Sequence, residues 1–418
     1  VPTPDEPRHA PTLPDTFTAG WVGFAAYDTV RYAEPERIPF SAAPPDHRNL
    51  PDLHFAFYPG AVVFDHATKL ITATQLAIIK PGDDPRDAHE HAAEELQRTI
   101  DALRQQTPTV TTALYTPPTP KNNHHELPPA LTSNTTPDAF HATVERAREY
   151  IRAGDIFQVV LGQTLTQTSS ADPFDVYRAL RVINPSPYMV YLQAEDCILI
   201  AASPEILCRV ATNPDDTRTI TNRPLAGTRP RGTTPSEDDR LEHDLKHDPK
   251  ENAEHVMLVD LARNDVGKVS KPASVSIDAA LEVERYSHVM HLSSTVTGTL
   301  KPQLDAWDAL RSTLPVGTVS GAPKIRAMQI IDELEPTRRG PYAGGIGYVS
   351  TDGDMDIALA LRTIVCPINA ANTTHNTTTW TYHLQASAGI VFDSDPVAEH
   401  TETLNKAAAL ITAITLAE

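Results

Sequence analysis

Apolar side chains recur at helical spacing in three segments of the chain, and turn residues separate these segments. The spacing predicts helices over residues 84–106, from Pro137 to Gly154, and over residues 174–183. The second of these helices begins with a Thr-Pro-Asp capping signal at residues 136–138. Glycine commonly follows the last helical residue, so Gly154 marks the end of this helix.

Runs of β-branched and aromatic residues between short turns predict strands along most of the remaining chain. The predicted strands are residues 17–28, 53–58, 61–65, 70–79, 155–163, 190–193, 197–203 and 205–211. Many strands are joined by short turns, and the helices do not alternate regularly with them. The pattern therefore predicts an α+β fold with large antiparallel or mixed sheets.

A stretch rich in threonine, proline and asparagine, residues 107–136, interrupts this pattern. Such composition is typical of a linker or a long surface loop. We therefore divide the chain into an N-terminal part (1–106), the linker (107–136) and a larger C-terminal domain (137–418). A chain of 418 residues is long enough for this division and for a sizeable core.

The segment from Leu314 to Ser350 contains a glycine-rich turn at residues 317–322. Pro323 is predicted at the first helical position, and the helix is expected to stop before Pro336. Residues 342–348 are then predicted to form a strand whose glycines allow close approach of another backbone or a ligand.

The start of this predicted helix is a candidate ligand site. Ser320 or Gly321 is expected near the helix cap, and glycine lets the backbone come close to a ligand. A helix N-terminus that follows a glycine turn favours an anion.

Composition and charge exclude several classes of partner. The chain has 35 basic and 54 acidic residues, so its net charge of -19 argues against binding to nucleic acid or an anionic membrane. No apolar run reaches transmembrane length, and the first residues do not form a signal peptide. Three scattered cysteines (Cys197, Cys208 and Cys366) indicate a reducing compartment, which predicts a cytoplasmic protein.

Two Glu-x-x-Glu pairs are the main chemical signal that the residues provide by themselves. Glu251 and Glu254 form one pair, and Glu399 and Glu402 form the other. Residues three apart share one face of a helix, so each helix can present two carboxylates to a hard divalent cation such as Mg²⁺. Such pairs are also common on solvated helices, and the residues alone leave that alternative open.

Three other residues are candidates for binding or proton transfer. Lys406 lies one turn after Glu402, where it forms either a substrate contact or an ordinary surface ion pair. Arg362 is predicted within an apolar strand, where its guanidinium needs a carboxylate partner. His291 titrates near neutrality and is a candidate for proton transfer, although it could be structural and His288 competes for the role.

Two sequence motifs resemble those of the chorismate-binding enzymes. They are GTVSGAPKIRAMQIIDELE at residues 317–335 and YAGGIGY at residues 342–348. That family includes anthranilate synthase component I, aminodeoxychorismate synthase component I, isochorismate synthase and salicylate synthase. The resemblance runs from about Pro137 to the C-terminus over several motifs. It implies the chorismate-binding fold, in which large, mostly antiparallel sheets pack face to face with helices outside.

The resemblance also implies roles for individual residues. It predicts that Glu254 and Glu402 bind Mg²⁺ directly and that Glu251 and Glu399 act through waters. For catalysis it implies His291 in proton transfer and Glu205 as the general acid that protonates the departing ring hydroxyl. The implied substrate-binding residues are Gly227, Thr318, Tyr342, Arg362, Gly389 and Lys406.

Two positions distinguish between reactions of the family. Members that add water to chorismate have a general-base lysine where this chain has Gln158, so the residue favours addition of ammonia. Many aminodeoxychorismate synthases have a lysine where this chain has Ala226, which favours the anthranilate synthase reaction. The ammonia is expected from a separate glutamine amidotransferase subunit or from solution. Aminodeoxychorismate or aminodeoxyisochorismate synthesis remains an alternative, as does a non-catalytic homologue that binds an amidotransferase.

The family also implies a possible tryptophan site at Pro187, Tyr188 and Met189. In relatives that bind tryptophan, a Leu-Leu-Glu-Ser segment faces this turn, and the sequence lacks that segment. The resemblance also leads us to expect a shortened N-terminal region. We predict weak or no inhibition by tryptophan, and a low inhibition constant measured on this chain would contradict that prediction.

Overall fold

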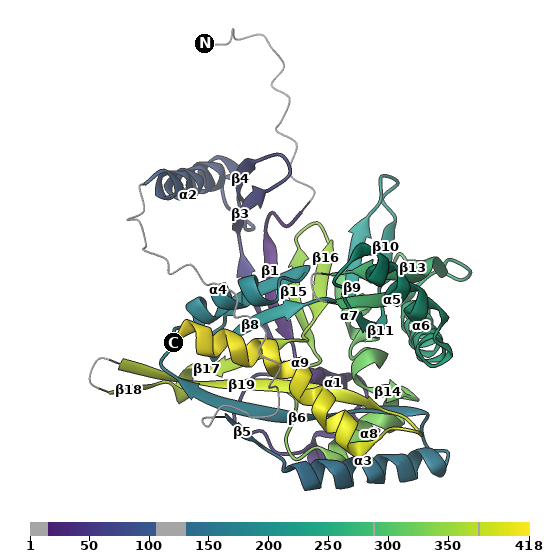
Figure 1. Ribbon diagram of the computed structural model, residues 1–418. Helices are drawn as coiled ribbons and strands as arrows, with labels where there is room; N and C mark the ends of the chain where they lie inside the picture. Colours follow the sequence, from purple (N-terminus) through teal and green to yellow (C-terminus); the bar gives the residue numbers. More distant parts are fainter. Residues whose placement is uncertain (1–15, 106–130, 287–288, 375–376) are drawn as a thin grey trace. The chain divides into compact units, whose positions relative to one another are not determined.

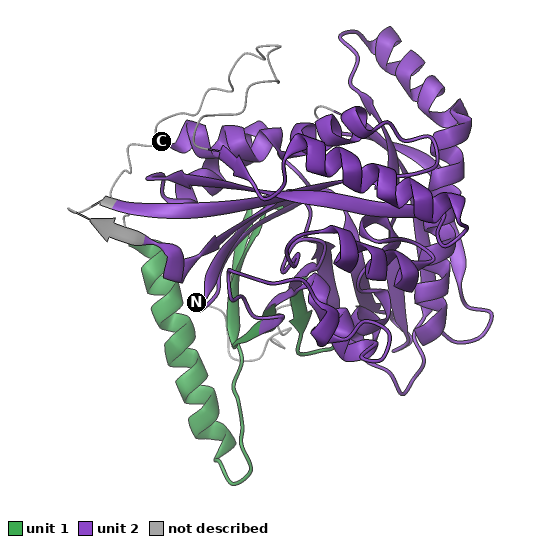
Figure 2. Ribbon diagram, turned by 90° about the horizontal axis from the view of Figure 1, so that it is seen from below, with its two compact units in different colours: residues 1–22, 55–113, 348–354 green, residues 23–54, 114–347, 355–418 purple. Residues whose placement is uncertain are grey.

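The computed structural model describes residues 16–105, 131–286, 289–374 and 377–418. The chain forms two compact units, each assembled from separate segments (Figure 2). The first unit comprises residues 1–22, 55–113 and 348–354, and the second comprises 23–54, 114–347 and 355–418. Most of the predicted linker lies outside the described residues, so the domain boundaries stay a prediction.

The first unit contains a β-hairpin and one long helix. The hairpin pairs β3 (Gly60–Asp65) with β4 (Leu70–Gln75) in antiparallel register. Helix α2 (Pro85–Arg104) follows, and the Asp84 carboxylate caps it by accepting a hydrogen bond from the Arg86 N–H. The helix predicted at 84–106 is therefore confirmed.

The second unit, drawn in purple in Figure 2, holds the remaining helices and most strands of the described chain, which Figure 1 labels. Its helices are η1 (Tyr27–Thr29), α1 (Val30–Ala33), η2 (Phe40–Ala42), α3 (Pro137–Arg152), α4 (Pro173–Ile183), α5 (Pro235–His247), α6 (Pro249–Val269), α7 (Ala306–Thr313), η3 (Gly317–Val319), α8 (Lys324–Leu334), η4 (Ile368–Ala370) and α9 (Pro396–Ala417). Its strands are β5 (Leu131–Ser133), β6 (Gln158–Ser169), β7 (Tyr188–Gln193), β8 (Cys197–Ser203), β9 (Ile206–Thr212), β10 (Arg218–Asn222), β11 (Leu225–Pro230), β12 (Ser276–Arg285), β13 (Val289–Thr299), β14 (Gly321–Ala322), β16 (Met355–Leu359), β17 (Thr363–Pro367), β18 (Asn372–Thr374) and β19 (Thr377–Ile390). Strands β1 (Gly20–Ala25), β2 (Leu53–Tyr58) and β15 (Gly345–Ser350) have residues in both units.

One sheet of the second unit has the strand order β14-β6-β19-β17-β8-β7. Its longest pairing is antiparallel and joins β6 to β19, from Ser169 opposite Trp380 to Val159 opposite Ile390. Helices α4 and α9 pack together, and α9 lies along β19 (Figure 1). Their apolar side chains form one core with the sheet, and burial of this surface stabilises the arrangement.

The other sheet contains the antiparallel neighbours β11-β13-β10-β9-β16, with β12 also paired to β13. Helices α5 and α6 pack against this group of strands. The predicted α+β class with large, mostly antiparallel sheets is confirmed. Two predicted strands, 53–58 and 197–203, coincide with β2 and β8.

The start of α8 differs from its prediction. Pro323 is the N-cap and not the first helical residue, and no side chain caps this helix. Gly321 lies two residues before this N-cap, where it belongs to β14 and pairs with Val159 on β6. A Cβ on Gly321 would lie 2.2 Å from the Gln158 carbonyl oxygen, so glycine is required for contact with the protein's own backbone.

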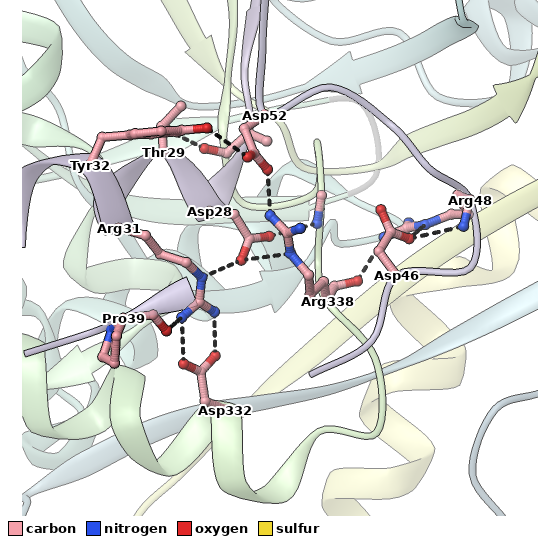
Figure 3. Close-up of polar contacts among 12 residues, drawn as sticks. Asp28, Thr29, Arg31, Tyr32, Pro39, Asp46, Arg48, Asp52, Asp332 and Arg338 are labelled. Atoms are coloured by element: carbon pink, nitrogen blue, oxygen red, sulfur yellow. Dashed lines mark hydrogen bonds and ion pairs between the residues drawn. The ribbon is translucent and has the colours of Figure 1, made fainter. Parts of the chain in front are cut away.

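The segment between α8 and β15 is fixed by buried arginines. Figure 3 shows Asp28 between Arg31 and Arg338, while Arg31 also reaches Asp332 on α8. Arg31 and Asp28 are each only 1% exposed. Because burial leaves these charges without water, each must be neutralised by its partners. The pairs thereby attach residues 28–31 to the end of α8.

Arg339 makes a second buried set of contacts within the same unit. Its guanidinium donates to both carboxylate oxygens of Glu335, at 2.6 and 2.9 Å. It also donates to the carbonyl oxygens of Val319 and Val160, at 2.5 and 2.7 Å. Arg339 therefore connects α8, strand β6 and the turn that carries Thr318.

We predict that Arg339→Met lowers the free energy of unfolding by about 3–5 kcal/mol, because it leaves the buried Glu335 charge unpaired. Urea denaturation measures the change. Arg326→Met is the matched control, since the ion pair of Arg326 with Asp155 is more than a third exposed on both sides. Its loss is expected to cost at most about 1 kcal/mol. Equal losses for the two variants would contradict the prediction.

Candidate active site

Glu205 lies in the short connection between β8 and β9 and is buried, with 4% of its surface exposed. The Thr318 hydroxyl donates to Glu205 Oε1 at 3.0 Å, and the Leu225 backbone N–H also bonds to the carboxylate. Burial raises the pKa of Glu205 to about 8, although these two donors and the Arg362 charge oppose the rise. The protonated acid is therefore present at neutral pH.

Arg362 lies between β16 and β17 and not within a strand, so the predicted strand position is wrong. Its φ of 48° places the backbone in the left-handed region, which interrupts the ladder between Leu359 and Thr363. Burial lowers the pKa of Arg362, whereas Tyr342 and Glu205 are the nearby groups that raise it. Among the described residues, none hydrogen bonds or ion-pairs with its guanidinium, which leaves it available for an anionic ligand.

Tyr342 and Lys406 meet at Ser387 on β19. The buried Tyr342 hydroxyl donates to Ser387 Oγ at 3.0 Å. Lys406 Nζ on α9 donates to the Ser387 carbonyl oxygen at 2.9 Å and pairs with Glu402 at 2.7 Å. Ser387 therefore holds two of the predicted substrate-binding residues in place.

His291 on β13 has a defined tautomer. Its Nδ1 lies 3.0 Å from the Gly227 carbonyl oxygen and 3.0 Å from Thr228 Oγ1. Because a carbonyl oxygen can only accept, Nδ1 carries the proton and Nε2 is left with a free lone pair. Burial, Arg362 and Lys406 lower the pKa of His291, so the neutral ring that can accept a proton is favoured at pH 7.

The carboxylates on helices α6 and α9 are close enough to repel one another. The pKa of Glu254 on α6 is raised by burial and by the negative charges of Glu251, Glu399 and Glu402. Burial and Glu402 likewise raise the pKa of Glu399 on α9. Repulsion of this kind between carboxylates on separate helices is relieved by a cation, and an all-oxygen donor set fits a hard divalent ion.

Positively charged side chains lie beside these carboxylates. Lys250 lies 4.0 Å from Glu254, and Arg229 lies 3.2 Å from Glu251. Within the residues that the structure describes, no three His, Cys, Asp or Glu side chains are grouped closely enough to hold a metal ion. The carboxylates therefore form a donor set with the right chemistry, but the protein groups alone do not complete a coordination shell.

A family profile described as chorismate binding enzyme matches residues 3–412 of the chain. The chain belongs to the chorismate-binding enzymes.

Several named proteins are similar in sequence to this chain over nearly its whole length. The chain is 53% identical to anthranilate synthase alpha subunit 1 of Oryza sativa subsp. indica over 99% of its own length and 71% of the relative. It is 47% identical to anthranilate synthase component 1 of Thermus thermophilus, covering 98% of this chain and 80% of the relative. A crystal structure of anthranilate synthase component I from Streptococcus pneumoniae is 39% identical, with a TM-score of 0.79 over 97% of this chain and 83% of that one. The resemblance and the fold predicted from the sequence are confirmed.

The two positions predicted to distinguish reactions of the family lie near the starts of strands β6 and β11. Gln158 begins β6 and is buried, and a Cβ on Gly389 would lie 2.7 Å from Gln158 Nε2. Gly389 therefore makes room for the Gln158 amide. Ala226 is half-buried on β11, where a β-bulge separates it from Thr228.

The turn predicted as a tryptophan site lies apart from these residues in the sequence. The Tyr188 hydroxyl donates to Asp356 Oδ1 at 2.9 Å and accepts from Arg209 at 3.0 Å. Met189 packs against the core of the sheet, whereas Pro187 is exposed. A tryptophan-binding role for this turn stays a prediction.

The structure identifies further residues near the candidate site that the sequence analysis did not predict. One predicted candidate is not among the described residues. Ser387 and Thr228 had no signal of their own, because their roles depend on contacts with distant parts of the chain. Glu284 and Tyr286 lie close to His291 in the sequence and could have been found from strand pairing. His288 lies outside the described residues. No described helix is both long and apolar enough to cross a bilayer.

Proposed function

We propose that this chain is an anthranilate synthase component I, a lyase that converts chorismate and ammonia to anthranilate and pyruvate in the first step of tryptophan biosynthesis. The observation that carries the proposal is a buried acid, Glu205, near an arginine whose guanidinium has no partner among the described residues. Relatives of about half identity are anthranilate synthase subunits, which supports the same reaction.

The anionic groups of chorismate require cationic partners inside a protein of net charge -19. We assign the guanidinium of Arg362, the hydroxyl of Tyr342 and the ammonium of Lys406 to this task, with Thr318, Gly227 and Gly389 shaping the pocket. A bidentate guanidinium suits a carboxylate. Glu254, Glu402, Glu251 and Glu399 would hold Mg²⁺. When bound, the ion would neutralise the ring carboxylate and polarise it.

Glu205 is assigned to the first chemical step. A bond forms between ammonia and ring carbon 2 as the bond between carbon 4 and its hydroxyl breaks. Glu205 donates its proton to the departing oxygen, so that water leaves. An acid with a pKa of about 8 retains this proton at pH 7 and can still release it during the reaction.

His291 is assigned to the elimination step. The proton on ring carbon 2 is removed, the bond between carbon 3 and the enolpyruvyl oxygen breaks, and the methylene carbon gains a proton to give pyruvate. The ring becomes aromatic as a result. The free Nε2 lone pair of His291 suits it to take up a proton, because Nδ1 is held by the Gly227 carbonyl.

The nucleophile is expected from a partner. We propose that a separate glutamine amidotransferase subunit supplies ammonia, and that free ammonium replaces it in vitro. Gln158 in place of a lysine base supports ammonia over water, because ammonia needs no deprotonation before it attacks.

Product analysis tests the proposal. The purified chain is incubated with chorismate, ammonium and Mg²⁺, and in parallel with a chelator in place of Mg²⁺. Fluorescent anthranilate and pyruvate in equal amounts, formed only with the metal, are the expected products. Aminodeoxychorismate, or aminodeoxyisochorismate that accumulates without pyruvate, would assign a different reaction. An absence of chorismate turnover would favour a non-catalytic role.

A further inference from the structure

Strand β12 places a carboxylate directly opposite His291. Strands β12 and β13 are antiparallel, and Glu284 and His291 are paired in their register. Side chains of directly paired residues point to the same face of a sheet, with their Cβ atoms about 4.5–5.5 Å apart. The Glu284 carboxylate and the His291 ring are therefore neighbours.

Two other residues fix this carboxylate. The Tyr286 hydroxyl donates to Glu284 Oε2 at 2.7 Å, and Arg223 lies 2.6 Å from Oε1. The ring of Tyr286 also packs edge-on against the His291 ring, with centroids 5.8 Å apart. The side chain of Glu284 is only 21% exposed, so its charge is partly shielded from solvent. A carboxylate held in this way keeps its position relative to His291.

We propose that Glu284, held by Tyr286 and Arg223, is a positioning residue that stabilises the protonated form of His291. The inference rests on the assignment of His291 to proton transfer. When His291 takes a proton, its ring becomes a cation. The bond from Nδ1 to the Gly227 carbonyl oxygen orients the ring and also favours its protonated form. Glu284 adds a fixed negative charge, which the carbonyl dipole does not supply.

Two cationic groups near His291 oppose its protonation. Arg362 approaches from the connection after β16 and Lys406 approaches from α9, and both disfavour a protonated His291. Strand β11 contributes the uncharged Gly227 carbonyl and the Thr228 hydroxyl. Glu284 is the carboxylate paired with His291 across the strands, and its charge favours protonation of the ring.

The test compares Glu284→Gln with Glu284→Asp and with Glu282→Gln. Gln keeps the acceptor for Tyr286 but removes the charge, and Asp retains the charge. Glu282 is the matched control because it is exposed on the same strand and faces Ser293. The acidic limb of kcat against pH is expected to move down by about one pH unit in Glu284→Gln. The plateau kcat should fall about threefold to tenfold because the base is weaker, with KM for chorismate unchanged.

A second readout does not require turnover. In protein labelled with ¹³C-histidine, the NMR signal that is absent from His291→Gln belongs to His291, and its titration midpoint is followed in each variant. The midpoint is expected to fall in Glu284→Gln and to stay near that of the unmodified protein in Glu284→Asp and Glu282→Gln. Tyr286→Phe, which frees the carboxylate to turn toward solvent, should produce a smaller fall and serves if Glu284→Gln does not fold.

An unchanged His291 midpoint in both Glu284→Gln and Tyr286→Phe would overturn the inference, as would an equal fall in Glu282→Gln. These outcomes are separate from a failure of the proposed function. If the unmodified chain does not consume chorismate, the proposed reaction is wrong, and the NMR midpoint alone decides whether Glu284 controls His291.

Discussion

Replacing Glu205 with glutamine is expected to lower kcat for anthranilate formation by about 10²–10⁴-fold, the range for loss of a general acid. Glutamine has nearly the same shape and still accepts from Thr318, but it has no acidic proton to give to the departing hydroxyl. Steady-state kinetics with chorismate and ammonium measure the change. KM for chorismate is expected to stay within a few-fold, because binding depends on other residues.

The same residue predicts a basic limb in the pH profile. The pKa of Glu205 is raised from 4.5 to about 8, so the acid form is lost and activity falls as pH rises through 8. Thr318→Val removes a hydrogen bond that favours the ionised form, so the limb should move to higher pH. A Glu205→Gln variant with more than a tenth of normal kcat, or a limb unaffected by Thr318→Val, would contradict the assignment.

The second large effect is expected from Glu254→Gln, and a similar one from Glu402→Gln. Each change removes one charged oxygen ligand from the predicted Mg²⁺ site. The loss of metal affinity should exceed the roughly 10- to 100-fold that is typical when an outer-shell partner of a metal site is removed. Activity measured over a range of Mg²⁺ concentrations gives this loss, and calorimetric titration of the protein with Mg²⁺ alone checks it without turnover.

Two comparisons make that experiment specific. Glu251→Gln should have a smaller effect, because Glu251 is predicted to act through water and already pairs with Arg229. Glu145→Gln on α3 is the control, since this exposed glutamate pairs only with Arg148 among its described contacts. Wild-type Mg²⁺ dependence in Glu254→Gln and Glu402→Gln together would remove the basis for the predicted metal site.

Local patterns predicted much of the secondary structure. Strands 53–58 and 197–203 match the structure at both ends, and the helix starting at Pro137 ends two residues before Gly154. Such elements are determined by the alternation or helical spacing of neighbouring side chains and by capping residues. Family membership was predicted on different grounds. Several sequence motifs that resemble those of the family occur in the chain in the same order.

The wrong predictions arose where distant backbone decides the conformation. Arg362 follows an apolar run, but its left-handed φ ends the ladder before it. Pro323 was predicted as the first helical residue, whereas the preceding residues 321–322 pair with strand β6 and the helix begins one residue later, at Lys324. Neither the backbone angle of Arg362 nor the pairing with β6 can be predicted from neighbouring residues in the sequence. The roles of the predicted site residues stay predictions. In the structure Glu205 accepts a hydrogen bond from Thr318, and Arg362 lies within electrostatic reach of Glu205 and Tyr342.

The long pairing of β6 with β19 joins strands that are far apart in the sequence, so the two are synthesised at different times. On a translating ribosome, β6 emerges well before its partner, and α9, with Glu399 and Glu402, emerges later still. An unpaired strand edge is a template for association with other chains. We therefore expect a chain released before β19 and α9 are made to be prone to association with other chains and to have no chorismate-converting activity.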